Sequence, residues 1–224
     1  MQVTALHGEQ DGERPDDAGR EPLLAIHNLS FGRDDVPLLR DLQFSVATGQ
    51  ILLIEGDNGS GKTTLLRLLC GLLEPWTGEI RWQGRDIRAC YPDYLRALSY
   101  VGHGNGVKLG LTALENLAVT RELAATDGQT DLTDILRSMG LAGHVDSQAR
   151  SLSAGQRRRL ALARLLFSGK CLWILDEPLT ALDETGRIML KNLFNEHLAG
   201  GGAIIMTSHD PFSLPGGVMV RLRL

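Results

Sequence analysis

Apolar and polar residues alternate at two places along the chain. The segment LQFSV at 42–46 has an apolar residue at every second position, and IRW at 80–82 has two apolar residues around an arginine. A repeat of two brings the apolar side chains of a strand to one face. We therefore expect a half-buried strand at each place.

Three uninterrupted apolar runs predict fully buried strands: ILLIEG at 51–56, CLWIL at 171–175 and AIIMT at 203–207. A helix-like run at 62–73 follows the first strand, and a predicted helix at 183–198 lies between the other two. Strands that alternate with helices in this way form a parallel sheet covered on both faces. The sequence thus predicts an α/β fold.

The middle of the chain has a different, entirely helical pattern. Thr112 and Glu115 have the spacing of a capping box, in which each side chain satisfies a free backbone N–H at a helix start. A second amphipathic helix is predicted over 132–139, ending at Gly140. We expect an all-helical insertion over about 111–168.

The composition indicates one ordinary globular domain with a polar N-terminal tail. Residues 1–22 are poor in apolar side chains and predict a disordered tail, which leaves 23–224 as one folded domain. The chain has 224 residues, 43% of them hydrophobic and 22% charged, with a net charge of −4. A negative chain provides no general attraction for nucleic acid, so we expect no nucleic-acid partner.

The cysteines and the apolar runs indicate a chain that is soluble by itself in a reducing compartment. Cys70, Cys90 and Cys171 are far apart and form no C-x-x-C pair, so free thiols are expected. The first 22 residues lack the apolar stretch of a signal peptide. The longest apolar stretch is interrupted by Arg67 and is too short to cross a membrane.

Residues 56–63 read GDNGSGKT and match G-x-x-x-x-G-K-[ST] between a predicted strand and a predicted helix. Such a loop directs backbone N–H groups toward phosphate oxygens, and the helix N-terminus adds a positive partial charge. A chance glycine turn is the alternative, and the flanking elements argue against it. The residues assigned to ATP are Gly56, Asp57, Asn58, Gly59, Ser60, Gly61, Lys62, Thr63 and Thr64.

Asp176 and Glu177 follow the apolar run at 171–175. A carboxylate at the end of a buried strand can hold the Mg²⁺ shell beside Thr63, and a second one can orient an attacking water. A strand that simply ends in charged residues is about as compatible with this pattern.

The segment LSAGQ at 152–156 predicts a helix start, because Ser153 and Gln156 form a second capping box. Three arginines, at 157–159, crowd the first turns, where the helix dipole disfavours cations. Either an anion lies nearby or these side chains are solvated.

Together these motifs resemble the ATP-binding subunits of ABC transporters over residues 23–224. LSAGQ is similar to the LSGGQ signature with Ala154 in place of a glycine, TALD at 180–183 resembles the D-loop, and Ser208-His209 resembles the switch histidine. The resemblance implies a P-loop NTPase fold with a parallel core sheet, an antiparallel β subdomain and a helical insertion.

The resemblance also implies roles. Two copies dimerise head to tail, so that Ser153, Gly155 and Gln156 of one complete the phosphate site of the other. Glu177 is then the catalytic base, His209 bridges it to the γ-phosphate, and Thr63 and Asp176 hold Mg²⁺. Asp183 communicates across the dimer. Phe31 stands where the family has a tyrosine that stacks on adenine, and a role in the core is the alternative.

The stretch SYVGHGNGVKLG at 99–110 places His103 where most of the family has a glutamine that touches Mg²⁺ and the attacking water. Because a neutral imidazole still donates or accepts a hydrogen bond, His103 is assigned the same catalytic and metal-contacting role. The alternative is that it binds haem or a metal by itself.

This substitution, with VGHGNGVK followed by LTALENL, most resembles the ATP-binding subunits that serve cytochrome c maturation. That resemblance implies ATP hydrolysis coupled to haem export, or to release of haem from its periplasmic chaperone. It also implies permease partners of the CcmB and CcmC type, and a peripheral position on the cytoplasmic face of the bacterial inner membrane. An exporter ATPase for lipid, peptide or drug is the nearest rival. A soluble ABC protein of ribosomes or DNA usually has paired ATP domains or a coiled-coil insertion, which this sequence lacks.

Overall fold

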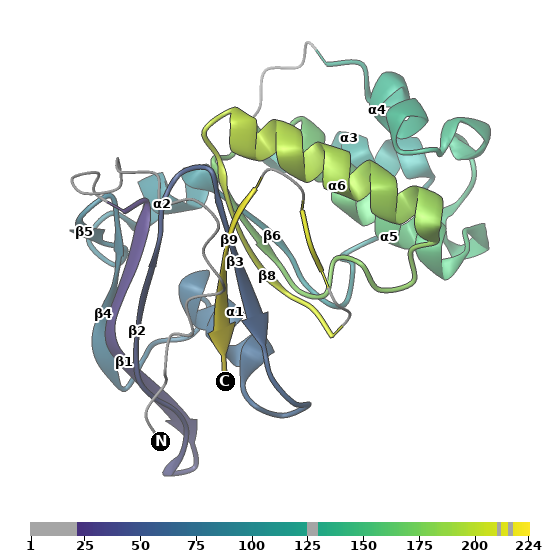
Figure 1. Ribbon diagram of the computed structural model, residues 1–224. Helices are drawn as coiled ribbons and strands as arrows, with labels where there is room; N and C mark the ends of the chain where they lie inside the picture. The colour runs from purple at the N-terminus through teal and green to yellow at the C-terminus, as the bar shows by residue number, and fades with distance from the viewer. Residues whose placement is uncertain (1–21, 125–129, 210–211, 215–216) are drawn as a thin grey trace.

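The structure is a computed structural model that describes residues 22–124, 130–209, 212–214 and 217–224. The predicted tail at 1–22 lies outside these residues except for its last position. Figure 1 shows a parallel sheet between an antiparallel sheet on one side and helices α3 to α6 on the other. The architecture is therefore α/β with two sheets, as expected.

The larger sheet has five parallel strands in the order β6-β7-β8-β3-β9. Its strands are β3 (Gln50–Glu55), β6 (Leu98–Val101), β7 (Leu172–Leu175), β8 (Ala203–Thr207) and β9 (Val218–Arg223). The three apolar runs of the sequence are β3, β7 and β8, which confirms the predicted parallel sheet. The sequence pattern did not predict β9, which lies at the sheet edge.

The smaller sheet is antiparallel, in the order β2-β1-β4-β5. Its strands are β1 (Leu24–Arg33), β2 (Val36–Val46), β4 (Thr77–Trp82) and β5 (Arg85–Asp86). The two alternating segments of the sequence are the end of β2 and the end of β4. Leu42, Val46 and Ile80 are buried, so the predicted half-buried strands are confirmed.

Three helices belong to the two-sheet part of the chain: α1 (Lys62–Leu69), α2 (Tyr91–Ala97) and α6 (Glu184–Ala199). Helix α1 ends before its apolar run does, because Gly71 turns the chain with φ +68° beneath the ring of Tyr91. A Cβ there would lie 2.5 Å from that ring, so only glycine fits this turn. Helix α6 is capped by the preceding residue, Asp183, whose side chain accepts from the N–H of Gly186 at 2.9 Å.

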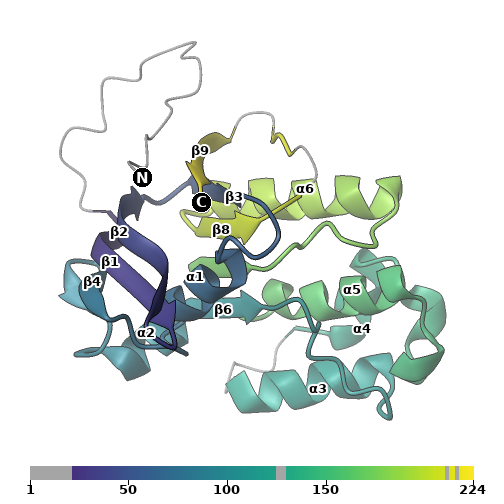
Figure 2. The same ribbon diagram turned by 90° about the horizontal axis from the view of Figure 1, so that it is seen from below.

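The helical stretch consists of α3 (Ala113–Ala124), α4 (Leu132–Ser138), η1 (Ala142–His144), η2 (Ala149–Ser151), α5 (Ala154–Ala163) and η3 (Arg164–Leu166). Both predicted capping boxes form, at Thr112–Glu115 and at Ser153–Gln156. Figure 2 shows α3, α4 and α5 grouped on the side of the molecule away from the antiparallel sheet. The division of the chain into a core and a helical subdomain at about 111–168 stays an interpretation.

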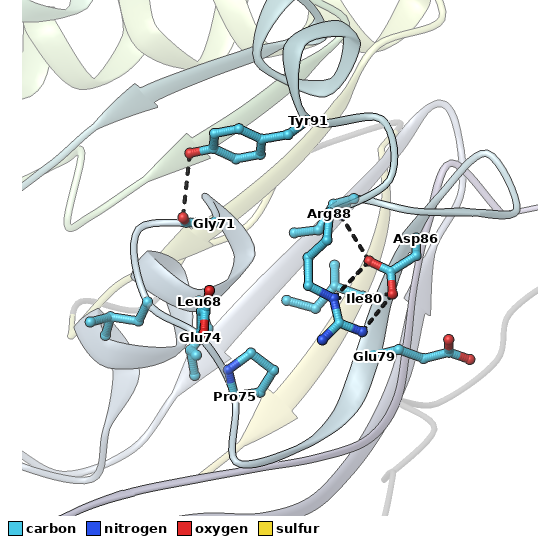
Figure 3. Close-up of a pocket in the computed structure, with 11 residues that line it drawn as sticks. Leu68, Gly71, Glu74, Pro75, Glu79, Ile80, Asp86, Arg88 and Tyr91 are labelled. Atoms are coloured by element: carbon cyan, nitrogen blue, oxygen red, sulfur yellow. Dashed lines mark hydrogen bonds and ion pairs between the residues drawn. The ribbon is translucent and has the colours of Figure 1, made fainter.

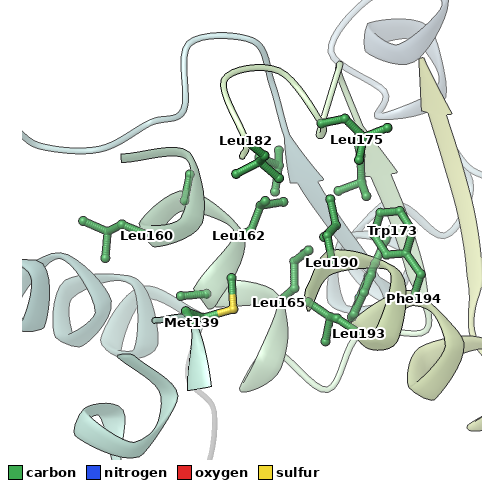
Figure 4. Packing of buried hydrophobic residues seen from close by; sticks show 14 of the residues in the cluster. Met139, Leu160, Leu162, Leu165, Trp173, Leu175, Leu182, Leu190, Leu193 and Phe194 are labelled. Atoms are coloured by element: carbon green, nitrogen blue, oxygen red, sulfur yellow. The ribbon is translucent and has the colours of Figure 1, made fainter. Parts of the chain in front are cut away.

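The parallel sheet is covered on both faces, and its strands alternate between two cores. In β3, Ile51 and Leu53 pack in the core shared with the helical stretch and α6, whereas Leu52 and Ile54 pack against α1 and the antiparallel sheet. Figure 4 shows the first core, where residues of α5 and α6 meet Trp173 and Leu175 of β7. The sheet is thus fixed from both sides, which holds its strand ends in place for a site.

Two expectations about the chain's environment can be compared with the structure. Cys70, Cys90 and Cys171 are all free, as their spacing predicted. Across the parts of the chain that the structure describes, no helix is long and apolar enough to cross a membrane.

Candidate functional site

The phosphate loop runs from the end of β3 to the start of α1, and its lysine is folded back onto it. Lys62 is 7% exposed, and its Nζ donates to the carbonyl oxygens of Gly56 at 2.7 Å and Asp57 at 2.9 Å. Gly61 caps α1 with φ +103°, and a Cβ there would lie 2.9 Å from Leu39. Neither a capping side chain nor an acidic residue occupies the first turn of α1. Its N–H groups are therefore available to an anion.

Thr63 and Asp176 meet across the site, although they lie 113 residues apart. The Thr63 hydroxyl donates to Oδ2 of Asp176 at 3.0 Å, and Asp176 is only 2% exposed. A hydroxyl and a carboxylate are oxygen ligands of the kind that Mg²⁺ prefers, together with water and phosphate oxygens. No group of three or more His, Cys, Asp or Glu side chains that could hold a metal occurs among the described residues. This donor set fits Mg²⁺ bound together with a nucleotide.

Thr207, at the end of β8, forms hydrogen bonds with both Asp176 and Glu177. Its hydroxyl donates to Oδ1 of Asp176 at 2.8 Å and accepts from the backbone N–H of Glu177 at 2.9 Å. The sequence analysis missed this residue. The available signal was a polar side chain closing a buried apolar run, directly before Ser208-His209.

Glu177 and His209 form a pair beside this network. Nε2 of His209 lies 3.0 Å from Oε1 of Glu177, and Thr180 donates to Oε2 at 3.2 Å. Glu177, Leu179, Thr180, Ser208 and His209 line a cavity of about 40 Å³. One water needs roughly 10–15 Å³. The carboxylate and the imidazole therefore line a space that is large enough for a water.

His103 lies in the loop after β6 and is exposed. Its ring forms no hydrogen bond or ion pair with any residue in the described ranges. The loop itself is held by the residues on either side of the histidine: the carbonyl of Gly102 and the side chain of Asn105 both accept from Arg158. The imidazole is thus on a fixed loop and open to a ligand.

Ser153, Gly155 and Gln156 lie at the start of α5. The Ser153 hydroxyl accepts from the N–H of Gln156 at 3.1 Å, and the Gln156 side chain accepts from the N–H of Ser153 at 2.8 Å. Gly155 packs so closely on the carbonyl of Ala181 that a Cβ would lie 2.6 Å from it. Within the described residues, no hydrogen bond joins this segment to the phosphate loop.

The three arginines that follow the signature have distinct surroundings, and the expected anion is found near Arg158, where the Asp176 carboxylate lies close by. Arg158 is 3% exposed and hydrogen-bonded to four oxygens, none of them a carboxylate oxygen. Burial lowers the pKa of its guanidinium to about 10, while the nearby Asp176 carboxylate opposes that shift. Arg157 donates to the carbonyl of Leu152, and Arg159 lies against Gly140. The sequence analysis singled out Arg158 with its two neighbours but did not predict its hydrogen-bond partners in the site.

Phe31 is half-buried at the end of β1. It packs against the core between α1 and the antiparallel sheet, and its ring centroid lies 6.3 Å from that of Trp76. Across the strand pair it faces Leu39, whose side chain touches Gly61 of the phosphate loop. The core role is therefore observed, and the adenine-stacking role stays a prediction for a ring beside the loop.

A larger cavity of about 250 Å³ lies away from these residues, between the end of α1, β4, β5 and α2 (Figure 3). Its walls include Leu68, Ile80 and Tyr91, and Arg88 forms an ion pair with Asp86 at its rim at 2.6 Å. The hydrogen bond from Arg88 lowers the pKa of the Asp86 carboxyl. None of the residues assigned to ATP lines this cavity.

Comparison with known proteins places these features in one family. The family model described as ABC transporter matches residues 39–180. The chain is 46% identical over 204 residues to the cytochrome c biogenesis ATP-binding export protein CcmA of Nitrosospira multiformis, covering 91% of this chain and 99% of that protein. It is 49% identical over 189 residues to the CcmA of Nitrosomonas europaea, covering 84% and 89%.

Among solved structures, a putative ABC transporter ATP-binding protein from Pyrococcus furiosus is similar with a TM-score of 0.76 and 26% identity, over 89% of this chain and 96% of that chain. A bacterial Atm1-family ABC exporter with ATP bound has a TM-score of 0.77 and 25% identity, over 91% of this chain and 38% of that chain.

Proposed function

The chain belongs to the ABC transporter family and, within it, to the CcmA group of ATP-binding export proteins, and from this premise we propose how its site works and what it serves. It is an ATPase. We infer that it hydrolyses Mg-ATP to drive haem export, or the release of haem from its periplasmic chaperone, during the assembly of c-type cytochromes. The observation that carries the ATPase site is the meeting of Thr63, Asp176, Glu177 and His209 at one edge of the parallel sheet.

ATP binding rests on the loop between β3 and α1. The uncapped N–H groups of α1 and the Lys62 ammonium face the same loop, and both favour the negative charge of phosphates. Lys62 is held by two carbonyl oxygens, so its position is set before a nucleotide arrives. Phe31 pairs with Leu39 across β1 and β2, next to the loop, and we propose that its ring stacks on the adenine.

Hydrolysis needs a water directed at the γ-phosphorus. Glu177 orients this water and accepts its proton as the new phosphorus–oxygen bond forms and the bond to the bridging oxygen breaks, which leaves ADP and inorganic phosphate. His209, whose Nε2 lies 3.0 Å from Oε1 of Glu177, would bridge this carboxylate to the γ-phosphate. Thr63, Asp176 and His103 would hold Mg²⁺, which neutralises charge on the phosphates when it is bound.

One copy of the chain has one phosphate loop, which leads into α1, and one signature segment, which begins α5. We propose a head-to-tail homodimer in which the exposed Ser153, with Gly155 and Gln156, contacts the nucleotide of the partner. Integral membrane permease subunits of the CcmB and CcmC type would anchor the dimer at the cytoplasmic face of the inner membrane. The alternative substrate is a lipid or drug carried by another exporter.

The test replaces the chain in its source cell with Lys62→Ala and stains for c-type cytochromes. We expect all c-type cytochromes to be lost while b-type haem proteins are retained, because phosphate binding is required at the loop. Arg40→Ala, at an exposed position on β2, is the control and should leave staining unchanged. Normal staining with Lys62→Ala would reject the maturation role and favour the other exporter.

A further inference from the structure

Arg158 lies at the centre of the site without belonging to any assigned motif. It is on α5, within two turns of the signature serine, and is 3% exposed. Its acceptors are the carbonyl of Gly102 at 3.1 Å, Oδ1 of Asn105 at 2.7 Å, the carbonyl of Asp176 at 2.6 Å and the carbonyl of Pro178 at 3.4 Å.

These four acceptors form two pairs. Gly102 and Asn105 lie on either side of His103, and Asp176 and Pro178 lie on either side of Glu177. One planar guanidinium therefore binds residues that flank His103 and residues that flank Glu177, which are both proposed to act on the γ-phosphate and the water. Its donors have fixed directions, so the four bonds set the position of the two loops relative to each other.

Both loops have backbone conformations that need such support. Glu177 has φ +49° and Asn105 has φ +50°, in the left-handed region that non-glycine residues rarely adopt. Strained residues of this kind persist where their surroundings over-determine them. The Asp176 carbonyl, which accepts the shortest of the four bonds, belongs to the peptide directly before Glu177. Arg158 thus holds the peptide whose orientation sets the Glu177 side chain.

We propose that Arg158 is a positioning residue for ATP hydrolysis that fixes the His103 loop and Glu177 in a single frame, carried on the helix that begins at the signature segment. This inference rests on the proposed ATPase site. Because the phosphate loop contributes none of the four acceptors, Arg158 acts on turnover and not on nucleotide binding.

The experiment compares Arg158→Lys and Arg158→Met in the full chain, assayed in membranes together with its permease subunits. Lysine keeps the charge but places its donors on one atom, which cannot span four acceptors. We expect kcat to fall about tenfold for lysine and on the order of 10²-fold for methionine, the loss that a misplacement of about 1 Å produces. KM for ATP should stay within roughly twofold. Asn105→Ala, which removes one acceptor, should lower kcat by less than lysine does.

Arg164→Met is the matched control. Arg164 follows α5 directly, and burial lowers the pKa of its guanidinium. It donates to the carbonyl of Tyr100 at 3.2 Å but to none of the four acceptors of Arg158. We expect a lower melting temperature for Arg164→Met with kcat close to that of the wild type. Amide hydrogen exchange should rise over 102–105 and 176–178 in Arg158→Met. In Arg164→Met, whose guanidinium lies against Gly106, exchange should stay unchanged over 176–178.

Three outcomes would overturn the proposal: a wild-type kcat in Arg158→Lys and Arg158→Met, a rise in KM that accounts for the whole loss, or an equal loss of kcat in Arg164→Met. Lys62→Ala distinguishes this failure from failure of the proposed function. If Lys62→Ala keeps full ATPase activity, the proposed ATPase site itself is wrong. If Lys62→Ala is inactive and the Arg158 variants are not impaired, the ATPase site stands and only the positioning role of Arg158 is rejected.

Discussion

Thr207 donates its hydroxyl proton to the Asp176 carboxylate at 2.8 Å, so that the end of β8 holds the end of β7. The same oxygen accepts the N–H of Glu177 at 2.9 Å. Thr207 is fully buried, and both of its partners are assigned to the hydrolytic site. A single neutral hydroxyl therefore sets the position of the carboxylate that is proposed to contact the metal and of the residue after it.

Thr207→Val should destabilise the protein and slow turnover. Valine has the shape of threonine but leaves a buried carboxylate oxygen and a backbone N–H without their partner, which costs about 1–3 kcal/mol for such a group. We expect the free energy of unfolding, measured by urea denaturation, to fall by that amount and kcat to fall with it. Thr207→Ser keeps the hydroxyl and should retain most of the activity. Equal stability and activity in the valine variant would contradict this role.

Most of the secondary structure could be predicted from the sequence, because long apolar runs and capping boxes are local signals. The three buried strands, the two capping boxes and the αβ alternation all form where the pattern placed them. Strand β1 was missed because its alternation is broken by register shifts around Leu29 and by a left-handed residue at Asn28. The period of two does not survive such irregularities.

The site was predictable where a motif carries it and not where packing carries it. Lys62, Asp176 and Glu177 belong to short patterns with a direct chemical reason. The partners of Arg158, in contrast, lie 18–56 residues away in the chain, so the local rule on cations at helix starts had no access to them. Thr207 likewise becomes part of the site only because β8 pairs with β7.

Glu177→Gln should retain ATP binding and lose nearly all turnover. The amide has the size of the carboxylate but cannot accept the proton of the water, and general base catalysis contributes roughly 10²–10⁴-fold. We expect kcat to fall by that factor with the Kd for ATP unchanged, measured by equilibrium binding. Glu184→Gln, at an exposed position in the first turn of α6, is the matched control and should behave as the wild type. Near wild-type turnover in Glu177→Gln would remove Glu177 from the catalytic role.

Ser153→Arg should abolish hydrolysis while a single chain still binds ATP. The substitution removes the capping hydroxyl, which costs about 1 kcal/mol, and places a bulky cation on the surface proposed to meet the partner's nucleotide. Measured by ATPase assay and by size-exclusion chromatography with ATP, the variant should be inactive and monomeric. Ser151→Arg, two residues earlier and also exposed, should remain active. Loss of ATP binding by the single chain would indicate misfolding instead.

Phe31 has an observed place in the core and a predicted one under the adenine, and the choice of substitution separates the two. Phe31→Leu keeps an apolar side chain for the core but has no aromatic face, whereas Phe31→Tyr keeps the face. Since stacking of a base on an aromatic ring contributes about 1–3 kcal/mol, we expect KM for ATP to rise roughly tenfold in the leucine variant and to stay unchanged in the tyrosine variant.

Trp76, whose ring centroid lies 6.3 Å from that of Phe31 and which is 49% exposed, should report the bound base by a change in its fluorescence. That change should be lost in Trp76→Phe and retained in Trp82→Phe, whose ring pairs with Tyr94 instead. If the leucine variant keeps its KM and only melts at a lower temperature, Phe31 serves the core alone.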